Sequence, residues 1–199
     1  MVTKFKEEEL SKIFFTSDTH FGHKNILEYC KRPFSSVGEM DSELIKNWNS
    51  VVGPNDIVYH LGDFFLGDLT EGLNFIIRLN GKIKLTIGNH DTDNRLKALG
   101  WISNIDDIQF GYRIKEGKKT FLLSHYPQFT GNYDNSKTFS IHGHTHFLTR
   151  FWELNDDFHN LMYNVSCEAI NCQPLNWIDI KLEIMAKQLE WAKMNKNKS

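Results

Sequence analysis

The sequence predicts an α/β fold organised around a parallel-rich β-sheet, and two features of the pattern carry this prediction. Short apolar runs, the first beginning at about Ile13, alternate with segments whose apolar spacing suits helices. Each run stops abruptly at polar residues, and the first is followed by Asp18 and His20. Open α/β sheets bind their ligands at the carboxyl ends of the strands. The polar residues at the strand ends are therefore the first candidates for a functional site.

Length and composition are those of an ordinary globular domain. The 199 residues, 40% hydrophobic and 24% charged, are enough to bury a substantial core. Because no repeat, low-complexity segment or linker interrupts the chain, we expect a single domain over residues 1–199. The net charge of -2 argues against a surface-wide electrostatic grip on nucleic acid, although a local basic channel is compatible with it.

The sequence predicts a cytoplasmic protein without a membrane segment. The N-terminal segment 4–9 is charged where a signal peptide would need apolar residues, and no run approaches ~18 apolar residues. The three cysteines, Cys30, Cys167 and Cys172, cannot all pair with one another. We therefore expect free thiols in a reducing compartment rather than a disulfide or a zinc site.

The first half of the chain is predicted to alternate helices with strands. Asp41 is the expected N-cap of a helix with one apolar face, formed by Leu44, Ile45, Trp48 and Val51. The other expected elements are a short helix at 24–29, strands at 56–61 and 84–87, and a helix at 69–79.

The second half is predicted to be richer in strands. Expected strands at 105–114 and 119–123 flank Glu116 and Gly117, which suit a hairpin turn, and further strands are expected at 138–141 and 161–165. Asn176, with Asp179 three residues later, resembles a capping pair for a C-terminal helix from about 177 to 194. The lysine-rich tail that follows is expected to fray.

Side chains that can bind metals follow five of the predicted strands. They are Asp18 and His20, Asp63, Asn89 and His90, His125, and His144 and His146. Carboxylate, amide and imidazole ligands suit first-row ions such as Mn, Fe or Zn better than a structural thiolate zinc site. These eight side chains are too many ligands for one ion. A pair of ions bridged by a carboxylate is the economical arrangement, and it serves in-line displacement at phosphorus.

In their order along the chain, these motifs resemble the five motifs of the calcineurin-like metallophosphoesterases. The matching residues are Asp18-x-His20, Gly62-Asp63, Gly88-Asn89-His90-Asp91, His125 and Gly143-His144-x-His146. The resemblance covers about the first 165 residues and implies a four-layer α/β/β/α sandwich, with two β-sheets face to face and helices outside. Phe64 and Phe65 stand where the larger phosphatases carry a further Asp and Arg. The chain therefore resembles the smaller bacterial and phage members, which argues against a protein-phosphatase role.

The resemblance also implies two divalent metal ions and a role for each motif residue. Mn is the best-suited ion, with Fe, Zn, Ni or Mg as alternatives. His90 is implied as the catalytic residue that protonates or stabilises the leaving oxygen. Asp91 either orients His90 and its loop or caps the following helix. The implied ligands of one ion are Asp18, His20, Asp63 and His146, and those of the other are Asp63, Asn89, His125 and His144, with Asp63 bridging.

Several residues near these motifs have two interpretations at this point. His23 could contact the substrate or form a hydrogen bond to a metal ligand. Arg32 could clamp a phosphate through two hydrogen bonds, but an ordinary surface arginine is favoured. Core or supporting roles are favoured for His60 and His142. Another set could either wall the pocket or simply pack: Phe64, Phe65 and Tyr126.

Three functions are compatible with the sequence. The leading one is a metal-dependent phosphodiesterase or phosphatase that acts on a small phosphorylated molecule or a nucleotide. Neither the physiological substrate nor the oligomeric state follows from the sequence. A nuclease acting on nucleic acid would need a localised groove of Lys and Arg residues. A non-catalytic interaction scaffold on the same fold would lack part of the ligand set, whereas every ligand position is filled here.

Overall fold

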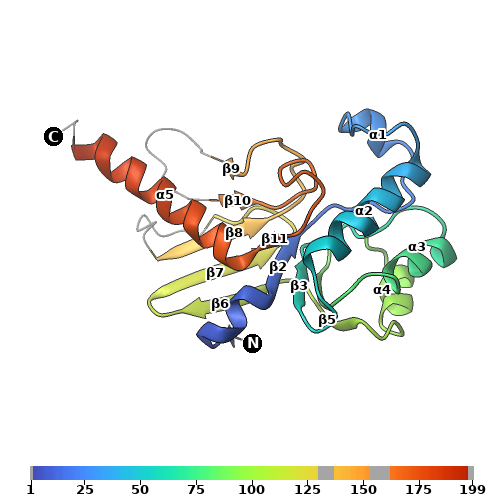
Figure 1. The fold of residues 1–199 in the computed structure, drawn as a ribbon, viewed down its shortest axis with the longest axis horizontal. Coiled ribbons are helices and arrows are strands. Elements are labelled where there is room, and N and C mark those ends of the chain that lie inside the picture. Colours follow the sequence, from blue (N-terminus) through green and yellow to red (C-terminus); the bar gives the residue numbers. More distant parts are fainter. Residues whose placement is uncertain (1, 130–136, 153–161, 197–199) are drawn as a thin grey trace.

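The structure is a computed structural model that describes residues 2–129, 137–152 and 162–196, and these residues contain two β-sheets (Figure 1). The first is a five-stranded sheet in the order β11-β2-β3-β4-β5. Its neighbours from β2 to β5 are parallel, and β11 is antiparallel to β2. The strands are β2 (Ile13–Thr16), β3 (Ile57–His60), β4 (Lys82–Thr86), β5 (Ile105–Gln109) and β11 (Leu175–Asn176).

The second sheet has six strands in the order β1-β6-β7-β8-β10-β9. The pair β6–β7 is the predicted hairpin, and β7, β8 and β10 run parallel to their neighbours in that series. The strands are β1 (Val2–Thr3), β6 (Tyr112–Glu116), β7 (Lys119–Ser124), β8 (Thr138–His142), β9 (Phe151–Trp152) and β10 (Met162–Asn164).

The prediction of a single strand at 105–114 is wrong, because the chain passes from one sheet to the other within these residues. It ends as β5 at Gln109 and restarts as β6 at Tyr112. Between them Phe110 is exposed, and a Cβ atom on Gly111 would lie 2.8 Å from the carbonyl oxygen of Leu123. A glycine is needed at this crossing, but the apolar alternation around it continues and hides the break.

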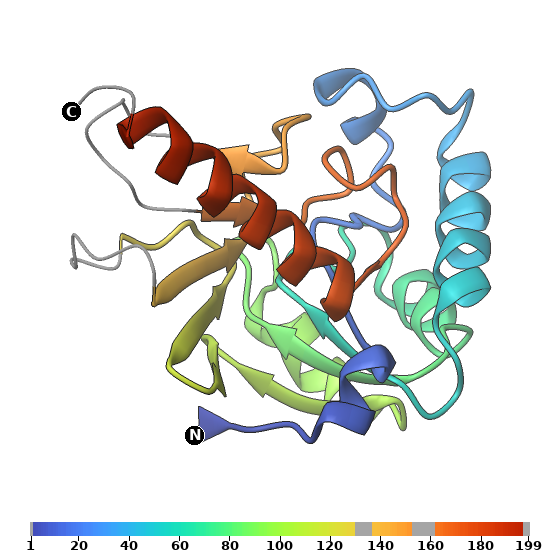
Figure 2. The same cartoon turned by 60° about the vertical axis from the view of Figure 1, so that its left-hand side comes forward.

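Helices cover the outer face of the five-stranded sheet (Figures 1 and 2). Their buried side chains, Trp48 among them, form one apolar cluster with Phe14 and Val58 of the sheet. The pattern of α2 suits this contact, since its apolar residues share one face. The helices are α1 (Ile26–Tyr29), α2 (Val37–Val51), α3 (Leu69–Ile76) and α4 (Asp93–Leu99), and a 3-10 helix, η1 (Glu7–Lys12), precedes β2.

The predicted N-cap at Asp41 is also wrong. Helix α2 begins at Val37, and its N-cap is Ser36, which accepts a hydrogen bond from the backbone N–H of Glu39. Asp41 lies within the helix, is buried, and accepts a hydrogen bond from the N–H of Gly22 at 2.9 Å. A carboxylate near a helix start has the same local appearance in both roles, and the distant partner, Gly22, shows which role Asp41 has.

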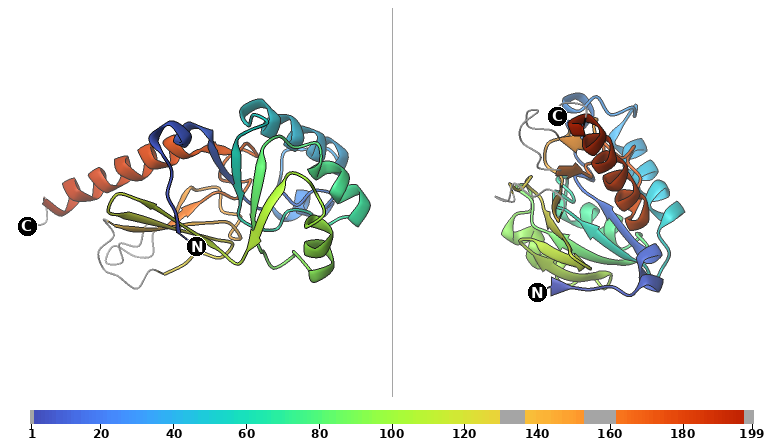
Figure 3. Two further views of the ribbon diagram at one scale, coloured as in Figure 1. Left: turned by 90° about the horizontal axis from the view of Figure 1, so that it is seen from below. Right: turned by 90° about the vertical axis from the view of Figure 1, so that its left-hand side faces the viewer.

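A second apolar cluster fills the space between the two sheets. Phe15 and Tyr59 of one sheet meet Phe121 of the other, and Trp177 packs against Phe15 and Phe121 at ring distances of 5.1 and 4.6 Å. Trp177 begins α5 (Trp177–Lys196), whose outer end extends beyond the sheets (Figure 3). The predicted α/β fold, with two facing parallel-rich sheets and helices, is confirmed.

The residues that end the sequence-predicted strands come together where the two sheets adjoin. Asp18 donates its backbone N–H to Gly62 at 3.0 Å, which joins the loops after β2 and β3. The N–H of Gly143 donates to His125 at 3.0 Å, which joins the loops after β7 and β8. A bridge between Ser17 and Ser166 links the two sheets.

Within the ranges given above, no helix combines the length and the apolar character needed to cross a bilayer.

Candidate metal centre

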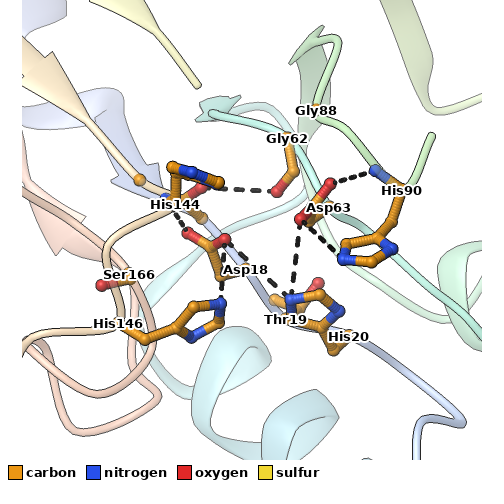
Figure 4. Close-up of polar contacts among 12 residues, drawn as sticks. Asp18, Thr19, His20, Gly62, Asp63, Gly88, His90, His144, His146 and Ser166 are labelled. Atoms are coloured by element: carbon orange, nitrogen blue, oxygen red, sulfur yellow. Dashed lines mark hydrogen bonds and ion pairs between the residues drawn. The ribbon is translucent and has the colours of Figure 1, made fainter. Parts of the chain in front are cut away.

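Two buried carboxylates form the middle of the site (Figure 4). Asp18 follows β2 and Asp63 follows β3, so neighbouring parallel strands carry both to the same edge of the sheet. A backbone N–H fixes one oxygen of each: Asp18 Oδ2 accepts from His144 at 2.9 Å, and Asp63 Oδ1 accepts from His90 at 2.8 Å. The second oxygen of each carboxylate therefore faces side chains.

Histidine rings surround these two second oxygens. Nε2 of His146 lies 3.6 Å from Asp18 Oδ1, and Nε2 of His20 lies 4.0 Å from the same atom. These separations exceed a hydrogen bond, but an ion with ligand distances of about 2.0–2.2 Å can span them. The Nε2 atoms around Asp63 Oδ2 are at 3.5 Å for His125, 3.7 Å for His20 and 4.0 Å for His90.

Buried atoms without partners mark the same place. Asp18 Oδ1 and both ring nitrogens of His20 have no hydrogen-bond partner among the described residues. Burial raises the pKa of Asp18 to about 6, and burial together with the charge of Arg32 lowers the pKa of His20 far below its usual range. The His20 ring is therefore neutral and keeps a free lone pair. Buried polar atoms of this kind are normally satisfied, and a bound cation would satisfy them.

The hydrogen bonds of His125 also fit a cation. Its Nδ1 lies 2.9 Å from the carbonyl oxygen of Leu61, which can only accept, so Nδ1 carries the proton. In the neutral ring, Nε2 is then an acceptor. It faces two further acceptors, Asn89 Oδ1 at 2.9 Å and Asp63 Oδ2 at 3.5 Å. Three acceptors directed at one point suit a metal ion.

The backbone is unusual at these positions. Left-handed φ angles of 50–65° occur at Asp18, His20, Asp63, His144 and His146. Such angles are uncommon outside glycine, and they concentrate at functional sites. Glycines allow the loops to close on the carboxylates, because a Cβ atom on Gly88 would lie 2.2 Å from Asp63 Oδ1 and one on Gly143 would lie 2.3 Å from Asp18 Oδ2.

The structure brings the predicted ligands together in two adjoining groups. Asp18, His20 and His146 each offer an atom within 4.8 Å of the others, and Asp18, Asp63 and His125 form a second such group. Asp18 belongs to both, although the sequence indicated only Asp63 as a shared residue. Asp63 Oδ2 nevertheless lies between His20 and His125. The remaining predicted ligands lie beside His125: Asn89 through its amide oxygen and His144 through its ring, 5.0 Å away.

His90 lies at the edge of this centre and Asp91 lies beneath it. The His90 side chain is 43% exposed, and its ring lies 5.5 Å from that of His20. The Asp91 carboxylate is buried and accepts from the backbone N–H groups of Gly88, Asp63 and Phe64 at 2.8–3.2 Å. Thr92 is the N-cap residue of α4, so the alternative of Asp91 as a helix cap is wrong. Asp91 orients the loops after β3 and β4.

Arg32 is not the surface arginine that the sequence favoured. Its side chain is almost fully buried, and its guanidinium donates to the backbone oxygens of Asp18 and Thr19 and to Glu168. These protein acceptors occupy its donors, which removes the basis for a phosphate clamp. His23 is half-buried, its ring lies 5.5 Å from that of His20, and burial lowers its pKa.

Sequence reasoning missed Glu168. Its Oε2 lies 2.9 Å from His146 Nδ1, and Cys30 lies in the same group. Burial alone would raise the pKa of Glu168, but its contacts with His146 and Arg32 lower this pKa to about 2, so the carboxylate is charged. Burial opposes protonation of His146, but bonds to Cys30 and Glu168 and the charge of Asp18 raise its pKa to about 10. The only sequence signal was that Glu168 follows the predicted strand at 161–165.

The surrounding residues support the loops in several ways. His60 Nε2 lies 2.9 Å from the Thr19 hydroxyl, and its ring stacks on Phe64, which fits the expected supporting role. His142 is likewise buried, with Nδ1 2.8 Å from the carbonyl oxygen of Gly143. Of the residues that could wall the pocket, Phe64 and Phe65 are buried and pack internally, whereas Tyr126 is half-exposed beside the His144 ring. Cys30, Cys167 and Cys172 are all free.

The model of the calcineurin-like phosphoesterase family matches residues 11–192. The chain belongs to the calcineurin-like phosphoesterase family. Members of this family use divalent metals and act on phosphorylated substrates. The groups of carboxylate and imidazole side chains described above are candidate ligands for such metals.

The chain is also similar to three individual proteins. An uncharacterized protein of Methanocaldococcus jannaschii, MJ1445, is 38% identical over 195 residues, which cover 93% of this chain and 95% of the relative. The Gene 66 protein of Mycobacterium phage L5 is 34% identical and covers 69% of this chain and 78% of its own length. The crystal structure of a protein of unknown function, AQ665 of Aquifex aeolicus, is 28% identical with a TM-score of 0.64, covering 85% of this chain and 97% of that one.

Proposed function

We propose that the protein is a dinuclear-metal-dependent phosphoesterase that hydrolyses phosphodiesters of nucleotides or other small molecules. The observation that carries the proposal is the pair of buried carboxylates, each with one oxygen fixed by a backbone N–H and the other facing histidine Nε2 atoms at 3.5–4.0 Å. A non-catalytic scaffold would have no need of such a charged and unpartnered group of atoms.

The proposed ligands are divided between two ions. Two divalent ions held there would neutralise phosphoryl charge and lower the pKa of a bound water. The proposed ligands are Asp18, His20, Asp63 and His146 for one ion, and Asp63, Asn89, His125 and His144 for the other. Carboxylate, amide and imidazole donors favour Mn²⁺, with Fe, Zn, Ni or Mg as alternatives.

His90 is the proposed proton donor. Its side chain is exposed enough to contact a substrate. The hydrogen bond from its backbone N–H to Asp63 fixes the backbone from which the ring projects. A proton held at a ring nitrogen there can pass to the leaving oxygen. Asp91 supports this loop by binding the N–H of Gly88, at the start of the loop that carries His90.

Removing divalent metals should abolish hydrolysis, because the charged phosphoryl oxygens would then meet carboxylates without compensating cations. After chelation and dialysis, we expect hydrolysis of a chromogenic phosphodiester to fall to background. Mn²⁺ should restore the rate best among Mn²⁺, Fe²⁺, Zn²⁺, Ni²⁺ and Mg²⁺. Elemental analysis of the reactivated protein should give two ions per chain. Full activity of the dialysed protein in excess chelator would contradict the proposal.

Phosphodiesters should be cleaved faster than phosphomonoesters. A monoester dianion needs more cationic contacts than a diester monoanion, and here the guanidinium groups of Arg32 and Arg95 donate to protein oxygens. Phe64 and Phe65 add no charge where the larger phosphatases carry Asp and Arg. We expect kcat/KM for bis-p-nitrophenyl phosphate to exceed that for p-nitrophenyl phosphate by about tenfold, which corresponds to a difference of about 1.4 kcal/mol in activation free energy. A clear preference for the monoester would overturn this expectation.

A further inference from the structure

A buried row of side chains lies behind His146, on the side away from Asp18. His146 Nδ1 lies 2.9 Å from Glu168 Oε2, and Glu168 Oε1 accepts from Arg32 Nε at 2.8 Å. The side chains of Glu168 and Arg32 are only 3% and 1% exposed. Because the ionised carboxylate can only accept, the ring donates through Nδ1. Its other nitrogen, Nε2, then faces Asp18 Oδ1 at 3.6 Å (Figure 4).

Arg32 connects this row to the opposite side of the centre. Its two terminal nitrogens donate to the backbone carbonyls of Asp18, at 2.6 Å, and Thr19, at 2.8 Å. One guanidinium thus fixes the loop that carries Asp18 and His20, and also the carboxylate that contacts His146. Arg32 lies after β2 of the five-stranded sheet and Glu168 lies after β10 of the six-stranded sheet, so this contact joins segments that follow strands of both sheets.

A purely structural role for this ion pair is the alternative. Buried ion pairs are weak contributors to stability, because desolvation offsets their attraction. The comparison with His125 distinguishes the two roles, since the neutral backbone carbonyl of Leu61 holds that ring. His146 instead faces a charged carboxylate. A carboxylate partner fixes the tautomer of a metal-binding histidine and makes its other nitrogen a stronger donor.

We propose that Glu168, held in place by Arg32, is a positioning residue that fixes the His146 ring with Nε2 toward Asp18 and strengthens metal binding on that side of the centre. The inference rests on the proposed function, because it requires that His146 bind a metal. Partners of this kind typically contribute about 10–100-fold to metal affinity. The effect should fall on the ion bound by His146, because the second proposed ligand group does not contain this ring.

The test is Glu168→Gln in the full-length protein, with the affinity for Co²⁺ and Mn²⁺ measured by competition with a chelator. Glutamine keeps the size of the side chain but removes its charge. We expect the affinity for one of the two bound ions to fall by about 10–100-fold and the affinity for the other to stay unchanged. The visible absorption of bound Co²⁺ should shift. Glu168→Asp, which keeps the charge, should recover part of the affinity and of the spectrum.

Glu183→Gln is the matched control. Glu183, on α5, is likewise a carboxylate paired with an arginine, Arg150, and it accepts from the hydroxyl of Tyr163 on β10. Among the described residues it contacts no candidate ligand. We expect this variant to lose thermal stability without any change in metal affinity or in the Co²⁺ spectrum. If both variants lose similar thermal stability but only Glu168→Gln loses metal affinity, the loss of affinity comes from the positioning of His146 and not from a folding effect.

The outcomes separate this inference from the proposed function. A wild-type protein that binds no divalent ion would defeat the proposed function itself. A wild-type protein that binds two ions, with unchanged affinities and spectrum in Glu168→Gln, would overturn the positioning role alone. An equal loss of affinity for both ions, with no recovery of affinity in Glu168→Asp, would also overturn the positioning role. The Arg32–Glu168 pair would then be a structural ion pair.

Discussion

Replacing Asp63 by alanine should reduce hydrolysis at least about 10³-fold, because electrostatic stabilisation at this centre depends on a carboxylate shared by both proposed ions. Asp63 Oδ2 lies 3.7 Å from His20 Nε2 and 3.5 Å from His125 Nε2, between the two groups. Elemental analysis should find the variant with no metal or with one weakly held ion. His146→Ala should instead empty mainly one site, since this ring belongs to only one of the two proposed ligand sets.

Asp56→Ala is a suitable control for Asp63→Ala. The Asp56 carboxylate also accepts a backbone N–H, that of Gly53 at 2.8 Å, but it lies before β3, at the opposite end of the strand from Asp63. Its removal should leave the metal content at two ions and hydrolysis unchanged. If Asp63→Ala retains two metals per chain, the bridging role of Asp63 is wrong.

The position of the centre was predictable because local patterns place it. Each short apolar run predicted a strand, and parallel strands place the residues that follow them at one edge. Asp18 and Asp63 therefore lie together, as the sequence indicated, on neighbouring strands of the five-stranded sheet. The hairpin at Glu116 and Gly117 was equally local and is present between β6 and β7.

The features that sequence reasoning missed all depend on distant partners. Asp41 looks like a helix cap until its contact with Gly22 is known. Glu168 merely follows a predicted strand in the sequence, and only its contacts with Arg32 and His146 show its place in the site. The break at 110–111 arises because the chain changes sheets, whereas apolar alternation continues on both sides of it. Patterns of period 2 or 3.6 report which face of an element is buried, but not which element covers it.

His90 offers the sharpest separation of catalysis from metal binding. Its neighbour Asn89 has the amide oxygen that lies beside His125, whereas the His90 ring is exposed at the edge of the centre. His90→Asn should therefore keep two metals. Loss of a general acid that acts only in the transition state lowers kcat and kcat/KM together, typically by about 10²–10⁴-fold.

The size of that loss should depend on the leaving group. p-Nitrophenolate is a good leaving group and needs little protonation, so the variant should lose less on p-nitrophenyl esters than on simple alkyl esters of the same phosphate. The measurement is the wild-type to variant ratio of kcat/KM for each ester class, with metal content determined on the same samples. Equal ratios would mean that His90 orients the phosphoryl group rather than donating a proton. Loss of an ion in the variant would mean instead that His90, and not only Asn89, is a ligand.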